Sequence, residues 1–550
     1  MIKIYFYILI SFSTLLSQIV PLRFLEETSS LDEIQEGLKS NVIVEIKTSI
    51  NPTDSIIWLG TGKGLSYQLD SLGGNSNFRT FNVSNNLTNG TKSTYLPSGG
   101  VSAIAIAGKK INPTTGNDTL IVSVANSKDG ESVGAGIVIG NFSRKSPTNP
   151  IEWEFFEQPI DNQDDSTLNW GGLEISALPV TVFENNITYD LSVGKEYYWA
   201  ASWAGGLRRL KKQNEGNSIR NWERVPLPDD NRSSFNCGEF YENYQLNPRD
   251  PPDGNHNHKV FSVLVYSDTI WVGTANGINR GIIDRSSTNN CINWKHYSFP
   301  NDGISGNWVI SIAKQQWNGK TTIWAVTRSA NEVGENSGVS YSRNDGETWS
   351  NINSLMDQYG YNIVVQDSLV YFASRNGLWK SIDGENFALY DPAIDKLRND
   401  QIIDNDVFSV LHDTRNYYSN QLWIGSADGL GRLHTPGFNA PIWQIYRSNY
   451  SSNKPYAYPN PFSPSIHNLM NGDGYLRFYY KVKQSDLIKL TIYNFAMQKV
   501  REIDYFRGIG QGSLKWDGRD DSGYLVSNGT YFCKLFYDNT SHWVKVVLVK

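Results

Sequence analysis

The chain contains few cysteines, and their number limits how it can be stabilised. Only Cys237, Cys291 and Cys533 occur among 550 residues. A disulfide-dense secreted scaffold needs more bridges than three cysteines can make, so stability must come from burial of an apolar core. Cys237 and Cys291 either pair in an oxidising compartment or remain buried thiols, and their spacing leaves both alternatives open. Cys533 is unpaired in either case.

Several signatures of common protein classes are missing. No segment beyond the N-terminus has 18 consecutive apolar residues, which predicts no transmembrane segment in the mature chain. The net charge is −6 and no stretch interleaves basic and aromatic residues, which argues against a nucleic-acid partner. The sequence also lacks a Gly-x-Ser-x-Gly motif, a phosphate-binding loop and a zinc motif. We therefore expect no metal and no cofactor, and no catalytic residue can be named.

The N-terminus is the one markedly apolar segment. Lys3 precedes an unbroken apolar run over residues 4–10, and the small residue Ser17 offers a cleavage point. The run is too short to span the roughly 30 Å of hydrocarbon in a bilayer. Residues 1–17 are therefore predicted to be a signal peptide, which implies a secreted or outer cell-surface protein that passes through the periplasm.

Aromatic residues and glycine are abundant. The chain has 17 Trp, 30 Tyr, 23 Phe and 47 Gly residues. Aromatic side chains favour pleated strands, and glycine favours tight turns between them. The composition thus predicts an all-β protein.

One phrase recurs along the chain: an apolar strand, a small residue, a turn, and a glycine that opens another strand. The clearest copies are Ile57–Leu65, Ile270–Ile278 and Leu422–Leu430. Looser copies are Ile121–Val124 with Gly136–Ile137, Tyr198–Ser202 with Gly206–Leu207, Ile323–Val326 with Gly338–Val339, and Tyr371–Leu378. The phrase therefore occurs seven times, and a repeat of this kind predicts a repeat architecture.

The flanks of the phrase repeat as well. Each copy follows a short apolar strand: Ile43–Val44, Val101–Ile104, Ile175–Leu178, Val260–Val263, Val309–Ile312, Asn362–Val365 and Val407–Val410. Each is followed by an aromatic residue that opens a fourth strand: Phe78, Trp153, Trp222, Trp294, Trp349, Phe387 and Trp443. Seven units of four strands predict a seven-bladed β-propeller over residues 40–450. A β-sandwich or a β-helix is the alternative architecture.

Blade packing gives the repeat its physical reason. A four-stranded sheet cannot bury both faces alone, so blades stack and their aromatic residues fill the space between them. The central tryptophans of the phrase are therefore predicted to be buried on equivalent second strands: Trp58, Trp199, Trp271, Trp324 and Trp423. The polar insertions Asn126–Gly134 and Asp229–His258 are predicted to be loops.

The repeats resemble two known groups of propellers. Their Trp-Val-Gly-Thr-x-x-Gly phrase is similar to the repeat of two-component-regulator sensor ectodomains. Ser342, Asn344, Gly346 and Trp349 match the Asp-box of sialidase-like propellers, with asparagine at the aspartate position. A second segment, Lys380–Phe387, keeps only the glycine and the final aromatic of that motif. The resemblance implies a structural hairpin turn without a catalytic role.

The C-terminal residues carry a second resemblance. Tyr458, Pro459, Asn460, Pro461 and Phe462 resemble the opening of the C-terminal sorting domains of the Bacteroidetes-type (type IX) secretion system. The resemblance implies that export machinery is a partner of residues 456–550. Ser448–Pro455 is predicted to be a mobile linker to the propeller.

A turn further along resembles the Ig-like domain of the flagellar hook-capping protein FlgD. It contains Trp516, Asp517, Gly518, Asp521 and Gly523. Alternating strands are expected at Tyr475–Val482, Leu487–Tyr493, Tyr531–Tyr537 and Trp543–Val549, as in a small sandwich.

Polar clusters admit a chemical and a structural interpretation. Asp517, Asp520 and Asp521 suit a turn better than a calcium site, because their spacing is not that of an EF-hand. His256 and His258 would be half of a metal site, but no further ligands lie nearby in sequence. Arginines recur at Arg208, Arg209, Arg280, Arg375 and Arg432, as a site that grips a carboxylate would need, yet repeat geometry explains them equally well.

Three functions remain open from these residues, the third being a structural adhesin held on the cell surface. The first is a non-enzymatic secreted or surface protein whose propeller binds a glycan or protein partner. The second is a secreted glycoside hydrolase or lyase at the central face of the propeller, although no pair of carboxylates stands out for it. Carboxylates that converge at the mouth would favour the enzyme, whereas an aromatic, carboxylate-poor mouth would favour binding.

Overall fold

The computed structural model describes residues 35–48, 56–69, 78–107, 117–143, 151–212, 220–330, 332–390, 393–395, 400–403, 405–414, 421–434, 442–448, 454–467, 473–507 and 510–550. The predicted signal peptide lies outside the described residues. Within them, all regular structure is β-sheet apart from two 3₁₀ helices, η1 (His256–His258) and η2 (Asn353–Leu355). No helix of this part is long and apolar enough to cross a membrane. The protein is all-β, as its composition predicts.

Within the described residues, seven antiparallel sheets share one plan, in which strands that follow each other in sequence pair side by side. From the innermost strand outward, the first sheet contains β2 (Ile43–Thr48), β3 (Ile56–Thr61), β4 (Gly64–Leu69), β5 (Phe78–Thr80) and β1 (Gln35–Glu36). The second contains β9 (Gly100–Ala107), β10 (Asn117–Lys128), β11 (Glu131–Ser143), β12 (Trp153–Phe156) and β7 (Lys92–Ser93). The third contains β15 (Thr188–Val193), β16 (Tyr197–Ser202), β17 (Gly206–Lys211) and β18 (Glu223–Val225).

The remaining four sheets continue the pattern. The fourth contains β21 (Val260–Tyr266), β22 (Thr269–Thr274), β23 (Gly277–Ile283), β24 (Ile292–Tyr297) and β19 (Ser234–Phe235). The fifth contains β25 (Trp308–Trp317), β26 (Lys320–Arg328), β27 (Gly338–Ser342) and β28 (Ser350–Asn351). The sixth contains β29 (Gly360–Gln366), β30 (Leu369–Ser374), β31 (Gly377–Ser381) and β32 (Ala388–Leu389). The seventh contains β35 (Val407–Asp413), β36 (Gln421–Ser426), β37 (Gly429–His434) and β38 (Ile442–Tyr446).

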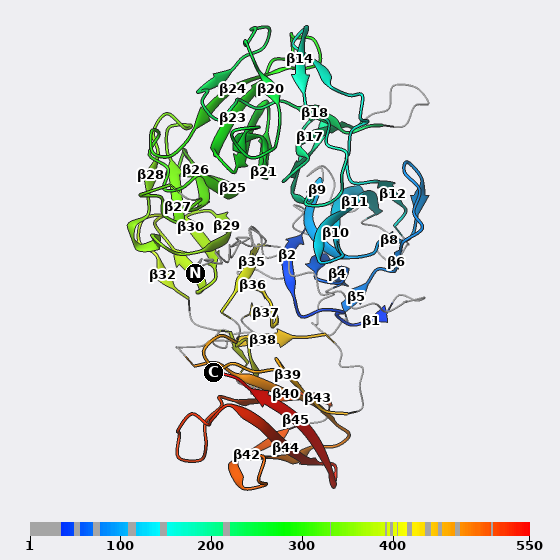
Figure 1. Ribbon diagram of the computed structural model, residues 1–550, viewed down its shortest axis with the longest axis vertical. Helices are drawn as coiled ribbons and strands as arrows, with labels where there is room; N and C mark the ends of the chain where they lie inside the picture. The colour runs from blue at the N-terminus through cyan, green and yellow to red at the C-terminus, as the bar shows by residue number, and fades with distance from the viewer. Residues whose placement is uncertain are drawn as a thin grey trace, which may run out of the picture.

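The innermost strands form a closed ring. Each of β2, β9, β15, β21, β25, β29 and β35 contacts the next, and β35 contacts β2 again. Figure 1 shows the labelled innermost strands β2, β9, β21, β25, β29 and β35 around a common centre, with outer strands such as β12, β24 and β28 at the periphery. Three smaller pairings lie outside this plan: β13 (Thr167–Trp170) with β14 (Leu173–Ala177) and β20 (Gln245–Leu246), β6 (Val83–Ser84) with β8 (Leu96–Pro97), and β33 (Ile394–Asp395) with β34 (Asp400–Gln401).

Each innermost strand carries a β-bulge near its start. The residue left out of the pairing with the second strand is Val44, Ser102, Tyr189, Phe261, Ile310, Tyr361 or Phe408 in chain order. A bulge re-aims side chains and increases local twist. The same bulge therefore occurs near the start of all seven innermost strands. The side chains of the bulged residues do not follow the regular alternation of the strand.

The turn within the repeated phrase explains its Thr/Ser-x-x-Gly spacing. The Thr274 hydroxyl donates to the Gly277 carbonyl at 3.1 Å and accepts the Asn276 N–H at 3.1 Å. Thr61, Ser374 and Ser426 make the same pair of hydrogen bonds in their sheets. Gly277 has φ +100°, and a Cβ there would lie 2.1 Å from the Tyr297 carbonyl oxygen, so a side chain is excluded.

The five predicted core tryptophans lie on the second strands of their sheets. Their exposed fractions are 3% or less, and they are Trp58, Trp199, Trp271, Trp324 and Trp423. Trp271 packs edge-on against Trp349 of the next sheet at 5.9 Å between ring centroids. The prediction that these residues are buried on equivalent second strands is confirmed.

Two local predictions are wrong. Ile175–Leu178 is not an innermost strand: Ile175 lies on β14, and β15 takes the innermost place in the third sheet. The alternation of apolar and polar residues in β14 is that of a half-exposed strand, which mimics the motif. Asn126–Gly134 is not a loop but extends the hairpin of β10 and β11.

A third prediction, a loop over Asp229–His258, is also wrong in part. The segment contains β19, β20 and η1, and it is tied down by a disulfide between Cys237 and Cys291. The structure thereby decides between the two alternatives for these cysteines. Cys533 is a buried free thiol.

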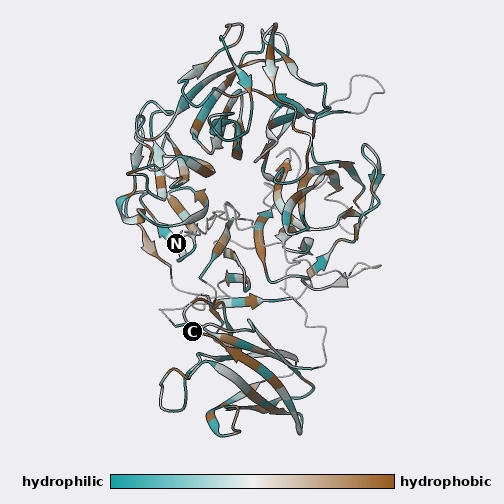
Figure 2. Ribbon diagram, viewed as in Figure 1, coloured by the Kyte–Doolittle hydropathy of each residue, from teal (hydrophilic) through white to brown (hydrophobic). Residues whose placement is uncertain are grey.

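The C-terminal residues form two further sheets. One contains β39 (Tyr456–Tyr458), β40 (Leu476–Val482) and β43 (Gly510–Trp516), and the other contains β42 (Lys499–Arg507), β41 (Asp486–Tyr493), β44 (Gly529–Tyr537) and β45 (Thr540–Leu548). Their buried side chains build a separate core that includes Phe462, Phe478, Leu490, Trp516 and Leu535. Figure 2 shows apolar residues concentrated along these strands and along the inner strands of the ring.

Candidate functional site

Seven aromatic side chains gather at one end of the innermost strands. We call them the aromatic collar: Tyr189, Trp203, Phe261, Trp308, Tyr359, Tyr361 and Phe408. Four of them are bulge residues, and the others lie on or directly beside an innermost or second strand. Because the start of each innermost strand pairs with the end of the second strand, the collar lies at the end of the ring where the hairpins between second and third strands are found.

The first part of the collar belongs to the third, fourth and fifth sheets. Trp203 stacks on Phe261 at 5.0 Å, and Trp308 lies 6.0 Å from Phe261 and 6.1 Å from Trp203. Lys259 lies over Trp203 at 4.9 Å and forms an ion pair with Asp250. Phe261 is buried, whereas the two tryptophans are half-buried. Each indole ring is therefore partly packed against its neighbours and partly accessible to a ligand.

The second part belongs to the sixth and seventh sheets and is bounded by arginines. The guanidinium of Arg328 lies 3.8 Å from the Tyr359 ring centroid and that of Arg375 lies 4.3 Å from it. Arg328 also donates to the Tyr359 hydroxyl at 2.8 Å and to the Gly360 carbonyl at 2.7 and 3.0 Å. Arg328 is buried, and burial lowers its pKa to about 10. Arg375 is exposed, so its charge faces solvent from a fixed position.

A hydrogen bond continues this part toward the seventh sheet. The Tyr361 hydroxyl donates to Asp406 Oδ1 at 3.0 Å, and the Tyr361 ring packs on Phe408 at 5.2 Å. Burial raises the pKa of Tyr361, and the nearby Asp406 charge adds to the effect. The hydroxyl is therefore a donor at neutral pH, and Asp406 is engaged by it.

Two carboxylates lie near the collar on innermost strands. Glu45 forms an ion pair with Lys47 at 3.0 Å, and Asp190 accepts the N–H groups of Leu191 at 2.8 Å and Val263 at 2.9 Å. Burial raises the pKa of Asp190 to about 7, partly offset by the Val263 hydrogen bond and by Lys47. A carboxyl group with such a pKa can give or take a proton near neutral pH.

The arginines recurring in the sequence do not converge. Arg208 is buried in a bidentate ion pair with Asp161, at 2.7 and 3.0 Å. Arg280 and Arg432 lie over Trp271 and Trp423, their cross-strand partners.

Arg209 follows a related pattern. It lies over Tyr197 at 4.5 Å and over Trp170 at 5.1 Å. Of the five arginines, Arg375 belongs to the collar region. Repeat geometry explains Arg209, Arg280 and Arg432, which pair across strands with the second-strand tryptophans, whereas Arg208 is held by Asp161.

The Asp-box-like turn is held by its own side chains. The Ser342 hydroxyl donates to Asn344 Oδ1 at 3.0 Å and accepts the Gly346 N–H at 2.8 Å, and Asn344 Oδ1 accepts the Thr348 N–H at 2.9 Å. Trp349 is buried after the turn. The turn lies between the third and fourth strands of the fifth sheet and is not part of the collar.

The second turn of this kind uses residues that the motif does not predict. The Ser381 hydroxyl donates to Asp383 Oδ1 at 2.8 Å and accepts the Gly384 N–H at 2.9 Å. Asp383 also accepts the N–H groups of Glu385 and Asn386 at 2.9 Å. The turn is one residue shorter between serine and glycine than the first, so a fixed spacing could not find it.

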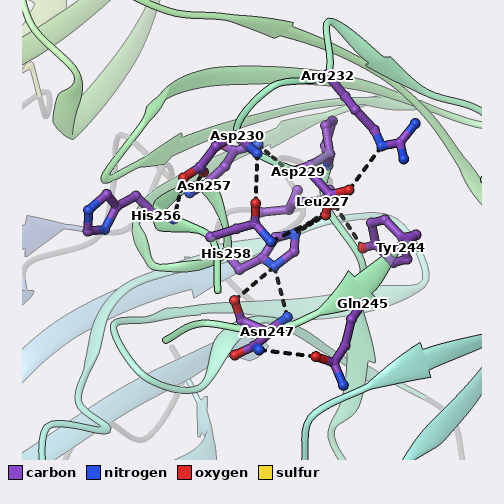
Figure 3. A network of polar contacts seen from close by, with 12 residues as sticks. Leu227, Asp229, Asp230, Arg232, Tyr244, Gln245, Asn247, His256, Asn257 and His258 are labelled. Atoms are coloured by element: carbon purple, nitrogen blue, oxygen red, sulfur yellow. Dashed lines mark hydrogen bonds and ion pairs between the residues drawn. The ribbon is translucent and has the colours of Figure 1, made fainter. Parts of the chain in front are cut away.

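The two histidines of η1 do not share a ligand site. Figure 3 shows the ring of His258 between Leu227 and Asn247, with His256 set apart from it. His258 Nδ1 accepts the Asn247 N–H at 2.9 Å, which leaves the proton on Nε2 to be donated to the Leu227 carbonyl at 3.0 Å. Burial lowers the pKa of His258. The neutral imidazole is thus a structural bridge inside the insertion.

The Tyr458–Phe462 segment lies against the last strand. Asn460 donates to the Lys545 carbonyl at 2.8 Å and accepts the Val547 N–H at 2.9 Å. Phe462 is fully buried in the C-terminal core, whereas Tyr458 is 56% exposed. Pro459 and Pro461 separate these three residues in the chain.

The predicted turn at Trp516 is also built from internal hydrogen bonds. Trp516 Nε1 donates to the Arg519 carbonyl at 2.8 Å, and Asp517 Oδ1 accepts the Arg519 N–H at 3.0 Å. Asp521 Oδ1 accepts the Glu502 N–H at 3.1 Å. Gly518 and Gly523 have positive φ angles of 73° and 84°. No group of three potential metal-ligating side chains occurs among the described residues.

The collar could not be found from the sequence. Its members come from five sheets, and no local spacing connects them. The one available signal was an aromatic residue directly after the small residue of the repeat or at the start of an innermost strand, as at Trp203 and Phe261. From the sequence alone, an aromatic residue at such a position could equally be a core residue. Only the arrangement of the seven sheets in a closed ring shows that these residues lie together.

Comparison with known proteins adds little to this picture. No family model and no curated protein matches the chain. Similar solved structures include PorZ, a surface component of the type-IX secretion system of Porphyromonas gingivalis (14% identity, 92% of this chain and 66% of that chain, TM-score 0.30). This chain thus spans about two thirds of PorZ.

Two further structures show the same weak likeness. One is the extracellular domain of a putative one-component system from B. thetaiotaomicron (13% identity, 93% of this chain and 81% of that chain, TM-score 0.19). The other is an ancestral GH74 enzyme (12% identity, 92% of this chain and 64% of that chain, TM-score 0.25). TM-scores this low carry no argument about activity or partners.

Proposed function

We propose that this chain is a secreted or cell-surface, non-enzymatic β-propeller protein that binds a glycan or protein partner at its aromatic collar. Residues 40–450 form the seven-bladed propeller in this proposal, and residues 456–550 form an Ig-like domain that directs type IX-like export. The closed contact between β35 and β2, together with the repeated bulge, supports the propeller. The separate core of the C-terminal sheets supports the second domain.

The collar is the observation that carries the binding function. Half-buried Trp203 and Trp308 offer flat apolar surface, and exposed Arg375 offers a fixed donor at the second part of the collar. Aromatic side chains and arginine are the residue types enriched at binding hot spots. The nearest carboxylate of the second part, Asp406, already accepts from Tyr361. The collar is therefore rich in aromatic groups, and the carboxylate of its second part is already engaged.

A glycoside hydrolase or lyase remains the second candidate, because of one specific group. Asp190 has a pKa near 7 and lies on an innermost strand close to Lys47 and Glu45. A general acid in a glycosidase needs a raised pKa of this kind.

A glycan array and a hydrolase screen on the mature chain separate these candidates. Trp308→Ala and Arg375→Ala should abolish retention of the glycan or protein that the wild type binds. Trp317→Ala is the matched control, since Trp317 is 42% exposed in the hairpin between β25 and β26, at the other end of the same strands. Binding unaffected by both collar variants would refute the collar as the site. Turnover that disappears in Asp190→Asn would favour the enzyme.

The export role rests on the Tyr458–Phe462 segment. Phe462 is packed in the core, whereas Tyr458 is exposed. The Tyr458 side chain is therefore available for recognition by export machinery. In the native host, Tyr458→Ala should leave a folded protein in the periplasm, which cell fractionation detects. Tyr524→Ala, at another exposed tyrosine of the C-terminal residues, is the control. Normal surface delivery of the Tyr458 variant would remove this residue from the export signal.

A further inference from the structure

A buried ion cluster joins the C-terminal sheets to the seventh sheet of the ring. Arg477 lies on β40 and is 1% exposed. It donates to Asp428 at 2.7 Å, to Asp400 at 3.2 Å and to the Gln401 carbonyl at 2.9 Å. Asp428 lies in the hairpin between β36 and β37, and Asp400 begins β34. A side chain of the C-terminal sheets thus reaches into the ring.

The ring supplies its own arginine to the same carboxylates. Arg447 follows β38 and forms ion pairs with Asp400 and Asp428. Burial would raise the pKa of Asp400, but the charges of Arg447 and Arg477 outweigh it and the pKa is lowered. Two arginines therefore balance two aspartates in a largely buried place. Lys515, on the neighbouring strand β43, also interacts with these charges, so removal of Arg477 would leave the two aspartates with less positive charge around them, which is unfavourable for buried carboxylates.

The cluster lies where the ring has no shared strand. All strands of the first sheet come from Gln35–Thr80 and all those of the seventh from Val407–Tyr446, so within the described residues no sheet joins the two ends of the ring. The seam is closed by side chains instead. Phe78 packs on Tyr446 at 5.1 Å, and Asn41 Oδ1 accepts the Ser448 N–H at 2.7 Å. Tyr446 and Ser448 flank Arg447 directly.

We infer that the C-terminal sheets clamp the ring closed, with Arg477 as the residue that locks them to the seventh sheet. Arg477 fixes Arg447 indirectly through the shared carboxylates, and Arg447 lies between the two residues that meet the first sheet. The clamp gives the C-terminal residues a structural role besides the proposed export. It also means that the ring and the C-terminal sheets are not independent of each other; residues 449–453 of the predicted linker lie outside the described residues.

Hydrogen exchange on the full mature chain tests the clamp. Arg477→Met keeps the aliphatic length and removes the charge. We expect exchange about tenfold faster in peptides from residues 421–446 and 56–69, on the two sides of the seam. Residues 269–283 of the fourth sheet should be unchanged. Faster exchange confined to residues 473–550, or no change, would overturn the proposal.

Two more variants keep the result interpretable. Lys489→Met is the matched control, because Lys489 lies on the same C-terminal unit in a partly exposed ion pair with Glu502 at 3.3 Å. It should leave residues 421–446 unchanged. If Arg477→Met does not fold, Ser513→Ala replaces it and should speed exchange in the same peptides, since Ser513 Oγ accepts from Arg477 at 2.6 Å and holds it from β43. Failure of the clamp would leave the export and glycan-binding assays unaffected, so the two proposals are separable.

Discussion

Asp190 and Asn362 make the same hydrogen bond at equivalent places in the third and sixth sheets. Each follows the bulge of its innermost strand, and Oδ1 of each accepts the N–H of the next residue at 2.8 Å. An amide therefore suffices for this local bond, and the negative charge of Asp190 is not needed to build the strand. Asp190→Asn therefore removes the charge and keeps the Leu191 bond, but it loses the acceptor that Oδ2 offers to the Val263 N–H at 2.9 Å.

Asp190→Asn should flatten the pH dependence of stability below neutrality. The folded pKa of Asp190 is raised to about 7 from 3.8, so its contribution is present at low pH and is lost as pH rises toward and through about 7. The melting temperature of the wild type should fall between about pH 4.5 and pH 7.5 relative to that of the variant. Parallel curves over this range would show that Asp190 does not titrate there.

His258 should destabilise the protein in acid. Its folded pKa is lowered by burial, so its contribution is complete above the unfolded value of about 6.5 and is lost as pH falls below it. The melting temperature of His258→Gln should decline less between about pH 7.5 and pH 5 than that of the wild type. Equal slopes would contradict the neutral, buried imidazole.

Trp271→Ala should destabilise the protein by about 3–5 kcal/mol, because the fully buried indole leaves a cavity between the fourth and fifth sheets. Its Nε1 donor to the Tyr266 hydroxyl, at 3.0 Å, is lost as well. Chemical denaturation measures the change. Trp317→Ala, at an exposed position, should cost less than about 1 kcal/mol. A Trp271 variant as stable as the wild type would show that this residue is not part of the core.

The disulfide between Cys237 and Cys291 should stabilise the insertion locally. The two cysteines are 54 residues apart, and closing such a loop typically contributes about 2–4 kcal/mol. The double variant Cys237→Ser and Cys291→Ser should therefore become sensitive to proteolysis between residues 229 and 258. Cleavage elsewhere in the ring first would contradict a local role. Cys533→Ser, which leaves the bridge intact, is the control for loss of a thiol.

The repeated strands could be predicted from the sequence, whereas the aromatic collar could not. The copies around Trp271 and Trp423 could be recognised because a strand, a turn and a glycine are local, and because each copy repeats them. The prediction for Ile175–Leu178 was wrong for the same reason. A local pattern of four mostly apolar residues predicts a strand but does not indicate which sheet that strand joins. The innermost place is taken by β15 instead. This strand contains the charged residue Asp190, so a search for short apolar strands does not find it.

The sequence by itself determined most of the strands, the turns and the buried tryptophans of this protein, since these follow from side-chain periodicity and from backbone hydrogen bonds between near neighbours. Only the tertiary structure decided that Trp203, Trp308 and Tyr359 belong to one collar, that Cys237 reaches Cys291, and that Arg477 reaches Asp428. Those arrangements join residues far apart in the chain. They depend on ring closure and on how two cores meet, and no local pattern encodes either.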